Sequence, residues 1–236
     1  MNLSLRNEHT FYVCATILAR DMKELEEAVF DALRKGADLV ELRLDYLENM
    51  EHVDKARIPW NRSIVTLRSQ LHGGLFEGDS EDVIRVVKML LRLRPRFVDL
   101  EMDVALKHLD FLPKVRDFSK IIVSWHSVEK TPELDELKGI TSRCVELGDL
   151  GKIVTMARSI NDSIRILMLY RLKNFRYINR LVAFAMGEQG LFSRVMSLVL
   201  GNPLFYVAYK ERAAPGQIRL EEGLKLAEVI RGEVKW

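Results

Sequence analysis

The chain has 236 residues and a mass of 27.3 kDa, which fits either two small domains or one large α/β barrel. Hydrophobic residues make up 48% of the sequence and the mean hydropathy is -0.04, so disordered and collagen-like classes are excluded. A net charge of +2 provides no overall field for nucleic acid or an anionic membrane, so any functional site must be argued locally.

The cysteines and the first ten residues bear on the cellular compartment. Cys14 and Cys144 each lie in an apolar run, which favours reduced, buried thiols over a disulfide. Residues 1–10 lack a basic start followed by an apolar stretch, and no run approaches the roughly 18 apolar residues of a membrane span. We therefore expect a cytoplasmic protein with neither a membrane nor a nucleic-acid partner.

Short apolar runs rich in β-branched residues predict eight strands, at 11–17, 39–44, 63–68, 96–102, 120–125, 151–156, 180–186 and 204–209. Segments with helical spacing lie between most of them, at 22–36, 80–95, 133–144, 159–172, 190–200 and 221–232, whereas 103–116 is weakly patterned. Gly36 is expected to end the first helix, Asp79 and Ser80 to cap the second, and Pro95 to end it.

Strands that alternate with helices predict parallel pairing through right-handed crossovers. Eight such units in this length match a closed (β/α)8 barrel, and a doubly wound open sheet is the structural alternative. We find no linker, low-complexity tract or shift in composition, so residues 1–236 are predicted to form one barrel domain.

Charged residues alternate with apolar ones in several of the predicted strands. In 40–45 the charged positions are Glu41, Arg43 and Asp45; in 97–102 they are Asp99 and Glu101, and Arg68 closes the third strand in the same way. Because the apolar face of a barrel strand meets the helices, these charges are expected to point into the barrel. Surface charges at strand ends are the alternative, but inward charge on three strands would need partners or a ligand.

The fifth and sixth strands carry a histidine and a lysine near their ends. Strand five ends in Ser124, Trp125 and His126, and strand six carries Lys152. A lysine walled by apolar groups and cationic neighbours has its ammonium disfavoured, and the free amine attacks ketones and aldehydes. A nearby imidazole can move protons at neutral pH. Taken singly, Lys152 fits a strand-end lysine reaching solvent and His126 a hydrogen-bonded loop histidine.

Two late segments predict contacts to a small anionic ligand. Residues 186–190 lead from strand seven into a helix bearing Ser193 and Arg194. A cation is therefore expected in the first turn beside free backbone N–H groups, and this combination predicts an anion site. Residues 213–217 read AAPGQ and could form a mobile flap that delivers Gln217 over the barrel mouth; a surface turn is the alternative. Neither nucleotide-binding glycine patterns nor metal-ligand spacings occur, so no cofactor or metal is expected.

In order along the chain, the segments Glu41 to Asp45, Arg68-Ser69, Ser124 to His126, Lys152, Met186 to Arg194 and Ala214 to Gln217 resemble type I 3-dehydroquinate dehydratase. The resemblance covers nearly the whole chain. It implies a cofactor-free (β/α)8 barrel that removes water from 3-dehydroquinate in the shikimate pathway. By this resemblance Lys152 forms a Schiff base with the C3 ketone. His126 takes the C2 proton, assists imine formation and hydrolysis, and donates a proton to the departing C1 hydroxyl.

The same resemblance assigns the remaining site residues. Arg194 would bind the substrate carboxylate with Gln217 closing over it, while Glu41, Arg43 and Arg68 would hold the ring hydroxyls and position His126; Met186 would support the site. The sequence departs from the family at two positions. His72 stands where a glutamate is usual, with Glu77 as the candidate replacement, and Ala213 stands where a serine is frequent. We expect these departures to alter affinity or loop closure rather than the chemistry.

Two other functions remain open at the level of sequence. A class I aldolase or transaldolase-like barrel also uses a strand lysine, but such enzymes commonly need a phosphate cradle near the last two strands. A catalytically silent barrel kept as a binding domain is the other, although it would be expected to lose Lys152 or His126. The sequence does not fix the oligomeric state, and a homodimer fits the family resemblance.

Overall fold

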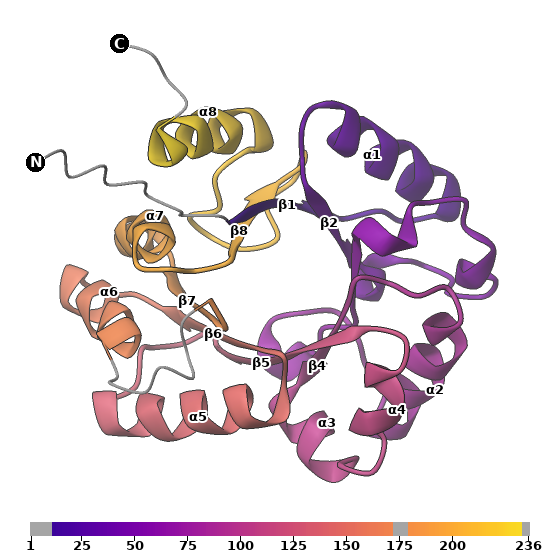
Figure 1. Ribbon diagram of the computed structural model, residues 1–236, viewed down its shortest axis with the longest axis horizontal. Coiled ribbons are helices and arrows are strands. Elements are labelled where there is room, and N and C mark those ends of the chain that lie inside the picture. The colour runs from indigo at the N-terminus through magenta and orange to yellow at the C-terminus, as the bar shows by residue number, and fades with distance from the viewer. Residues whose placement is uncertain (1–10, 172–178, 233–236) are drawn as a thin grey trace, which may run out of the picture.

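The computed structural model describes residues 11–171 and 179–232, and these form eight parallel strands. The strands are β1 (Tyr12–Ile17), β2 (Leu39–Arg43), β3 (Ser63–Thr66), β4 (Phe97–Glu101), β5 (Lys120–Ser127), β6 (Leu150–Met156), β7 (Leu181–Met186) and β8 (Leu204–Ala208). Hydrogen-bonded neighbours follow the order β7-β6-β5-β4-β3-β2-β1-β8, so every strand lies beside its predecessor in the chain except where β8 pairs with β1. Figure 1 shows them as a nearly closed ring surrounded by helices, which confirms the barrel and not the doubly wound sheet.

The outer layer consists of α1 (Met22–Arg34), α2 (Ser80–Leu91), α3 (Met102–Lys107), α4 (Leu112–Arg116), α5 (Leu134–Leu147), α6 (Ile160–Leu167), α7 (Leu191–Val199) and α8 (Leu220–Arg231). Short 3-10 turns supplement them: η1 (Leu44–Tyr46), η2 (Val53–Lys55), η3 (Trp60–Arg62), η4 (Gln70–His72), η5 (Met168–Arg171) and η7 (Glu188–Gly190). Every predicted strand and helix is present, with shifts at the ends. No described helix is long and apolar enough to cross a membrane.

The connections differ from the predicted pattern in three places. Between β2 and β3 the chain makes only η1, η2 and η3 and no α-helix, whereas the weakly patterned 103–116 forms the short α3 and α4. The second helix ends at Leu91 and not at Pro95, and Arg94 next to that proline has a left-handed φ of 55°. The predicted helix 159–172 is α6 followed by η5, and its last residue lies outside the described residues.

Helix ends follow their sequence signals where these are strong. Gly36 follows α1 with a φ of 111°, a conformation that glycine adopts without strain. Asp79 caps α2 and exchanges hydrogen bonds with Asp82 in a capping box. These signals are local, which is why they could be read without the tertiary structure.

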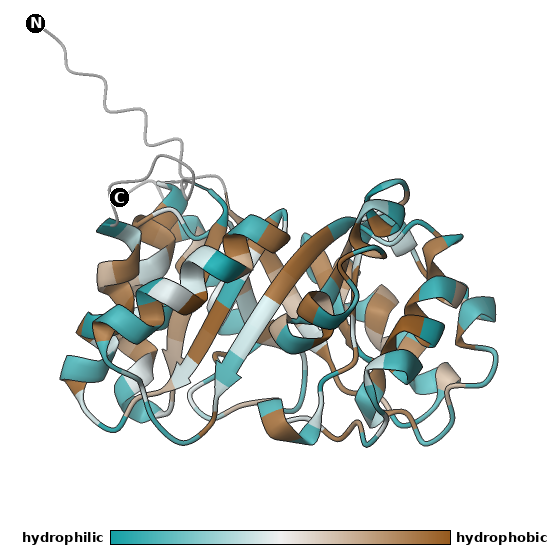
Figure 2. Ribbon diagram, turned by 90° about the horizontal axis from the view of Figure 1, so that it is seen from below, coloured by the Kyte–Doolittle hydropathy of each residue, from teal (hydrophilic) through white to brown (hydrophobic). Residues whose placement is uncertain are grey.

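Apolar side chains fill two separate spaces, between the sheet and the helices and inside the barrel. Figure 2 shows hydrophobic residues along the strands and on the inner faces of amphipathic helices. A further set of alternate strand residues closes the lower barrel: Cys14, Leu39, Ile64, Phe97, Ile122, Leu150, Leu204 and Tyr206 belong to it. Cys14 and Cys144 are both buried and free, as predicted.

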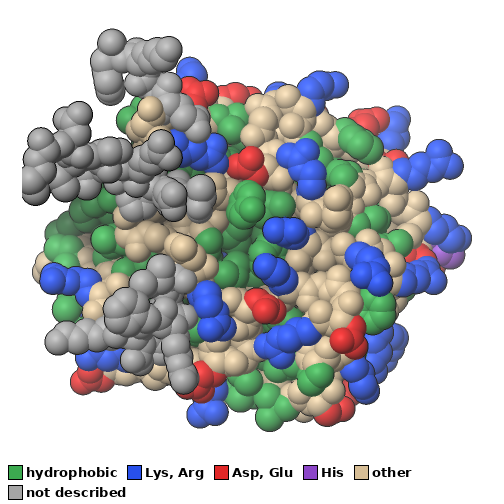
Figure 3. All heavy atoms as spheres, viewed as in Figure 1, with side chains coloured by type: hydrophobic (Ala, Val, Ile, Leu, Met, Phe, Trp, Pro, Cys, Tyr) green, Lys and Arg blue, Asp and Glu red, His purple; other side chains and the backbone are tan. Residues whose placement is uncertain are grey.

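The charged strand residues lie inside the barrel, nearer the carboxyl ends of the strands than this apolar set. Glu41, Arg43, Asp99, Glu101 and Lys152 are all buried, and each follows an inward apolar residue by two or more positions in its own strand. The predicted side-chain parity is therefore confirmed. Figure 3 views the opposite face, where the strands begin and lysine and arginine side chains gather near the surface. The fold thus places these buried charged groups toward the carboxyl ends of the strands.

Candidate active site

A cavity of about 160 Å³ opens at the carboxyl ends of the strands. It is lined by Thr16, Glu41, Arg43, Arg68, His72, Gly73, His126, Val128, Lys152, Val154, Met156, Phe184, Met186, Arg194, Tyr206, Ala213, Ala214, Pro215 and Gln217. All the catalytic and substrate-binding positions named from the sequence lie on this wall, with the exception of Glu77. Residues more than 170 positions apart in the chain are brought together because all eight strands end on one face of the barrel.

Lys152 lies at the centre of the cavity floor. Its Nζ donates to Glu41 Oε1 and Asp99 Oδ2, each at 3.1 Å, and lies 4.1 Å from the ring centroid of Tyr206. The expectation of apolar and cationic neighbours was therefore wrong, because its nearest polar partners are two carboxylates. Only an uncharged amine can attack a carbonyl, so any proton on Lys152 must pass to a neighbouring group before a Schiff base can form.

Asp99 connects Lys152 to Arg68, which follows β3. Arg68 donates to Asp99 Oδ1 at 2.7 Å and to Glu101 Oε1 at 3.1 Å, while Ser124 Oγ bonds both Arg68 and Asp99. Burial opposes ionisation of Asp99, but Arg68 and Lys152 outweigh it and hold the pKa of Asp99 well below its usual range. Burial likewise opposes the charge on Arg68, but Asp99 and Glu101 outweigh it and raise the pKa of Arg68. Asp99 and Arg68 therefore both stay ionised at neutral pH.

The second strand supplies two further fixed groups. Glu41 accepts hydrogen bonds from Thr16 Oγ1 at 3.0 Å and Thr66 Oγ1 at 3.2 Å in addition to that from Lys152. Arg43 forms a two-pronged ion pair with Asp45, at 2.8 and 2.7 Å. Both side chains are therefore held in one orientation before substrate arrives.

His126 lines the same cavity from the end of β5, and β5 pairs with β6, the strand that carries Lys152. Its Nδ1 is buried and has no hydrogen-bond partner within the described residues. Burial, followed by the charges of Arg68 and Lys152, holds the pKa of His126 well below its usual range. The imidazole is therefore neutral near pH 7 and able to accept a proton.

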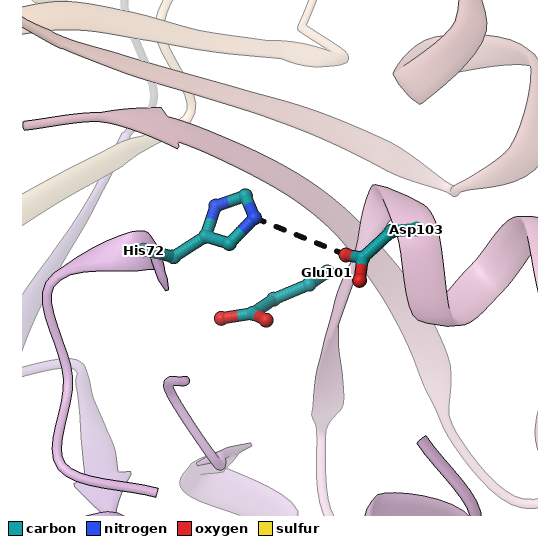
Figure 4. Close-up of side chains that lie close together, drawn as sticks. All are labelled: His72, Glu101 and Asp103. Atoms are coloured by element: carbon teal, nitrogen blue, oxygen red, sulfur yellow. Dashed lines mark ion pairs between the residues drawn. The ribbon is translucent and has the colours of Figure 1, made fainter. Parts of the chain in front are cut away.

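His72, at the position where a glutamate is usual, lines the cavity from η4. Its Nδ1 accepts the backbone N–H of His126 at 3.1 Å, and its Nε2 lies 3.8 Å from Asp103 Oδ1 (Figure 4). Glu77 is exposed, bonds only Gln70 in this region and does not line the cavity, so its predicted replacement role was wrong.

The side chains of His72, Glu101 and Asp103 each offer one ligand atom within 4.8 Å of the others. Glu101 Oε1, however, accepts from both Arg68 Nη1 and the Ser69 amide. His72 Nδ1 is also occupied. A cation placed here would face the Arg68 guanidinium, so the donor set fits a hydrogen-bonded cluster better than a metal site.

Arg194 lines the cavity and forms no ion pair with any other described residue. It lies in the first turns of α7, is 3% exposed, and stacks over the Phe184 ring at 4.2 Å. Its Nε has no hydrogen-bond partner in the described part of the chain, and burial lowers the pKa of Arg194 to about 10. A buried guanidinium without a counter-ion is strongly disfavoured unless an anion binds it, which agrees with the predicted anion site.

The segment 213–217 lies docked over the cavity mouth. Gln217 is buried, donates from Nε2 to Thr16 Oγ1 at 3.1 Å, and accepts the Ala213 amide at 2.9 Å. Gly216 has a φ of 74°, and a Cβ there would lie 2.4 Å from the Gly187 carbonyl oxygen. Glycine is thus required at 216, because the loop after β8 packs directly on the turn after β7.

Sequence reasoning overlooked three polar residues of the site, in addition to apolar residues of the cavity wall such as Phe184. Thr16 and Tyr206 line the cavity, and Asp103 faces His72 from α3. Alternation along β1 and β8 could have predicted Thr16 and Tyr206, because each lies two positions after a residue that points into the barrel, Cys14 and Leu204. Nothing in the sequence pairs Asp103 with His72, because that contact depends on where α3 begins.

Comparison with known proteins places this geometry in a family. Residues 13–232 match the family model described as type I 3-dehydroquinase. The 3-dehydroquinate dehydratase of Methanopyrus kandleri is 37% identical over 223 residues, which cover 92% of this chain and 99% of that protein. The enzyme of the same name from Methanococcus maripaludis strain C5 is 32% identical over 92% of this chain and 99% of its own length.

Among solved structures, the fold resembles 3-dehydroquinate dehydratase from Geobacillus kaustophilus, with a TM-score of 0.84 at 20% identity over 95% of this chain and 92% of that one. At this identity the likeness supports the fold alone. The family model, the archaeal relatives and the ordered residues of the cavity lead to the same conclusion. The chain belongs to the type I 3-dehydroquinase family.

Proposed function

We propose that this chain dehydrates 3-dehydroquinate to 3-dehydroshikimate through a Schiff base on Lys152. Membership of the family makes it a 3-dehydroquinate dehydratase, a hydro-lyase of the shikimate pathway that leads to the aromatic amino acids. The observation that carries the residue assignment is one cavity holding a buried lysine, a partly buried neutral histidine and a buried arginine with no ion-pair partner among the described residues.

The reaction begins at Lys152, whose proton must first pass to a neighbouring base. The free amine adds to the C3 carbonyl, and loss of one water gives an iminium. The iminium withdraws electrons from C2, so His126 can take the C2 proton. The C1 hydroxyl then leaves as water with a proton returned by His126, and hydrolysis of the iminium regenerates Lys152. Atoms balance, since the water consumed in hydrolysis equals that released on imine formation.

Polar side chains of the cavity wall orient the substrate. Arg194 receives the carboxylate at one end of the cavity, while Gln217 covers it from the loop after β8. Glu41, Arg43 and Arg68 already have their rotamers set by partners within the protein and present the remaining donors and acceptors to the ring hydroxyls. A single guanidinium suits a carboxylate better than the phosphate expected for an aldolase.

Borohydride trapping tests the proposed function directly. Incubation of the intact protein with 3-dehydroquinate and sodium borohydride should reduce the iminium to a stable secondary amine. Mass spectrometry should then find the added mass on one peptide, at Lys152. Protein incubated with borohydride alone is the control, and a trapped mass at another lysine, or none despite active dehydration, would overturn the assignment.

Arg194→Met is expected to raise KM much more than it lowers kcat. The substitution keeps a similar apolar volume over Phe184 but removes the charged hydrogen bonds, a loss of about 3 kcal/mol or about 100-fold in KM. Steady-state kinetics of both enzymes checks this, with Arg165→Met as the matched control, because Arg165 is a partly buried arginine of α6 that does not line the cavity. An unchanged KM for Arg194→Met would remove this arginine from carboxylate binding.

We also propose that the chain forms a homodimer through the outer face of α6 and α7. These helices pack side by side (Figure 1), and their outward large apolar residues are Ile160, Ile164, Met168, Leu191, Phe192 and Val199. Each of these side chains is more than two-fifths exposed, so together they form an apolar patch typical of a protein interface. A second copy offers the same surface across a two-fold axis.

Ile164→Glu should convert this dimer to monomer in light-scattering measurements at micromolar concentration. Burying a glutamate without a partner at the centre of an apolar interface is strongly unfavourable. Val229→Glu on α8 is the matched control, because Val229 is 49% exposed and Ile164 is 48% exposed. A wild-type monomer, or equal masses for all three proteins, would contradict this interface.

We infer that residues 1–236 act as one catalytic domain, since one sheet joins all eight strands of the described residues. A cytoplasmic location and the lack of nucleic-acid or membrane partners are proposed because the net charge is only +2 and the substrate is a small molecule.

A further inference from the structure

Strands β4 and β5 stop pairing before β5 ends. Their register runs only as far as Glu101 opposite Ser124, because β4 gives way to α3 at Met102. Strand β5 continues to Ser127, so its last residues have no strand on the side that β4 vacates. An amide pointing to that side needs another acceptor, since a buried N–H without a partner is costly. His126 lies in this extension.

The imidazole of His72 takes the place of the missing strand. Its Nδ1 accepts the His126 amide at 3.1 Å, and the two rings meet edge to face with centroids 5.8 Å apart. The backbone of η4 fixes His72 in turn. The His72 amide donates a hydrogen bond to the Ser69 carbonyl oxygen at 3.1 Å, and Gly73, which follows, has a left-handed conformation. Where His126 lies relative to Lys152 therefore depends on His72.

This contact also specifies the protonation state of His72. Because Nδ1 accepts a hydrogen bond, the proton of the neutral ring lies on Nε2, which faces Asp103 (Figure 4). The charged and titratable groups around this ring are Arg68 after β3, Asp99 and Glu101 on β4, Asp103 on α3 and His126 on β5. Burial lowers the pKa of His72; Glu101 and Asp103 oppose this, while Arg68 adds to it.

We propose that His72 is a positioning residue for His126, and that protonation of the His72 ring releases the His126 backbone and stops proton transfer at C2. A protonated imidazole donates from both nitrogens and so cannot accept the amide. It would also place a positive charge beside the ring that must receive a proton. The inference rests on the proposed function, in which His126 is the acid and base.

The pH profile of kcat in three variants tests this role. His72→Asn places an amide oxygen near the Nδ1 position, so it keeps the acceptor but cannot be protonated. Its kcat at neutral pH should stay within about 3-fold of wild type, as expected when a hydrogen bond is conserved. The acid limb should fall with the first power of proton concentration, whereas the wild-type limb falls with the second, since His72 and His126 must both be neutral.

His72→Leu removes the acceptor and should lower kcat about 10- to 100-fold with KM nearly unchanged. Asp103→Asn removes a group that favours the protonated ring, so the acid inflection should move to lower pH, by about 0.5 units. His52→Asn is the matched control and should leave the profile unchanged. His52 is an exposed residue directly before η2, and its left-handed φ is one that asparagine tolerates.

A second readout does not require catalysis. Nitrogen chemical shifts of imidazoles in the intact labelled protein should include one ring protonated at Nε2 with an accepting Nδ1, and His72→Asn should remove that signal. A parallel acid limb in wild type and His72→Asn, or a His72 ring protonated at Nδ1, would refute the positioning role. Loss of wild-type dehydration or of the Lys152 adduct would instead refute the proposed function, and the nitrogen shifts would still decide the state of His72.

Discussion

Replacement of Lys152 by methionine is expected to eliminate the borohydride adduct and to reduce kcat by more than about 10,000-fold. Methionine has nearly the length of lysine but no amine, so the iminium that acidifies the C2 proton cannot form. The two carboxylates that bind Lys152, Glu41 and Asp99, lose their shared partner at the same time. Initial rates with 3-dehydroquinate and whole-protein mass after borohydride treatment measure the two effects.

Lys152→Arg separates the nucleophile from the charge. Arginine keeps a cation between Glu41 and Asp99, yet its guanidinium stays protonated and does not form an imine with a ketone. This variant should therefore remain as inactive as Lys152→Met while unfolding at a temperature closer to that of wild type. Lys120→Met, at the exposed start of β5, is the control on the same sheet. Substantial dehydration by either Lys152 variant would exclude the Schiff-base mechanism.

Substitution of His126 by alanine should lower kcat about 100- to 10,000-fold, the usual contribution of a positioned general acid and base. The trapped adduct should still form, although more slowly, because the attacking amine belongs to Lys152. The buried environment that keeps His126 neutral predicts that wild-type activity falls as pH decreases and the ring takes up a proton.

The control for this substitution is His108→Ala, at the end of α3 and away from the cavity wall. It should preserve both kcat and the adduct. If His126→Ala formed product at the wild-type rate, the C2 proton would have to leave to another group. If it failed to form any adduct, His126 would act mainly in imine formation rather than at C2.

The two departures from the family pattern have different consequences. Ala213 still contributes its backbone amide to Gln217, so the loop closes over the cavity without a serine hydroxyl. His72 brings a titratable ring into contact with the backbone of His126. The first change alters one polar contact at the cavity mouth, whereas the second ties the geometry of His126 to the protonation of a neighbour.

The sequence alone determined the eight strands, the barrel and the inward parity of Glu41, Arg43 and Asp99, because these depend on local alternation and spacing. It could not show that two carboxylates hold Lys152, since Glu41 and Asp99 come from other strands and only their register brings them within 3.1 Å. It also could not show His72 bonded to His126. That contact arises because β4 ends before β5, and such an offset between strands is decided by packing of the whole barrel.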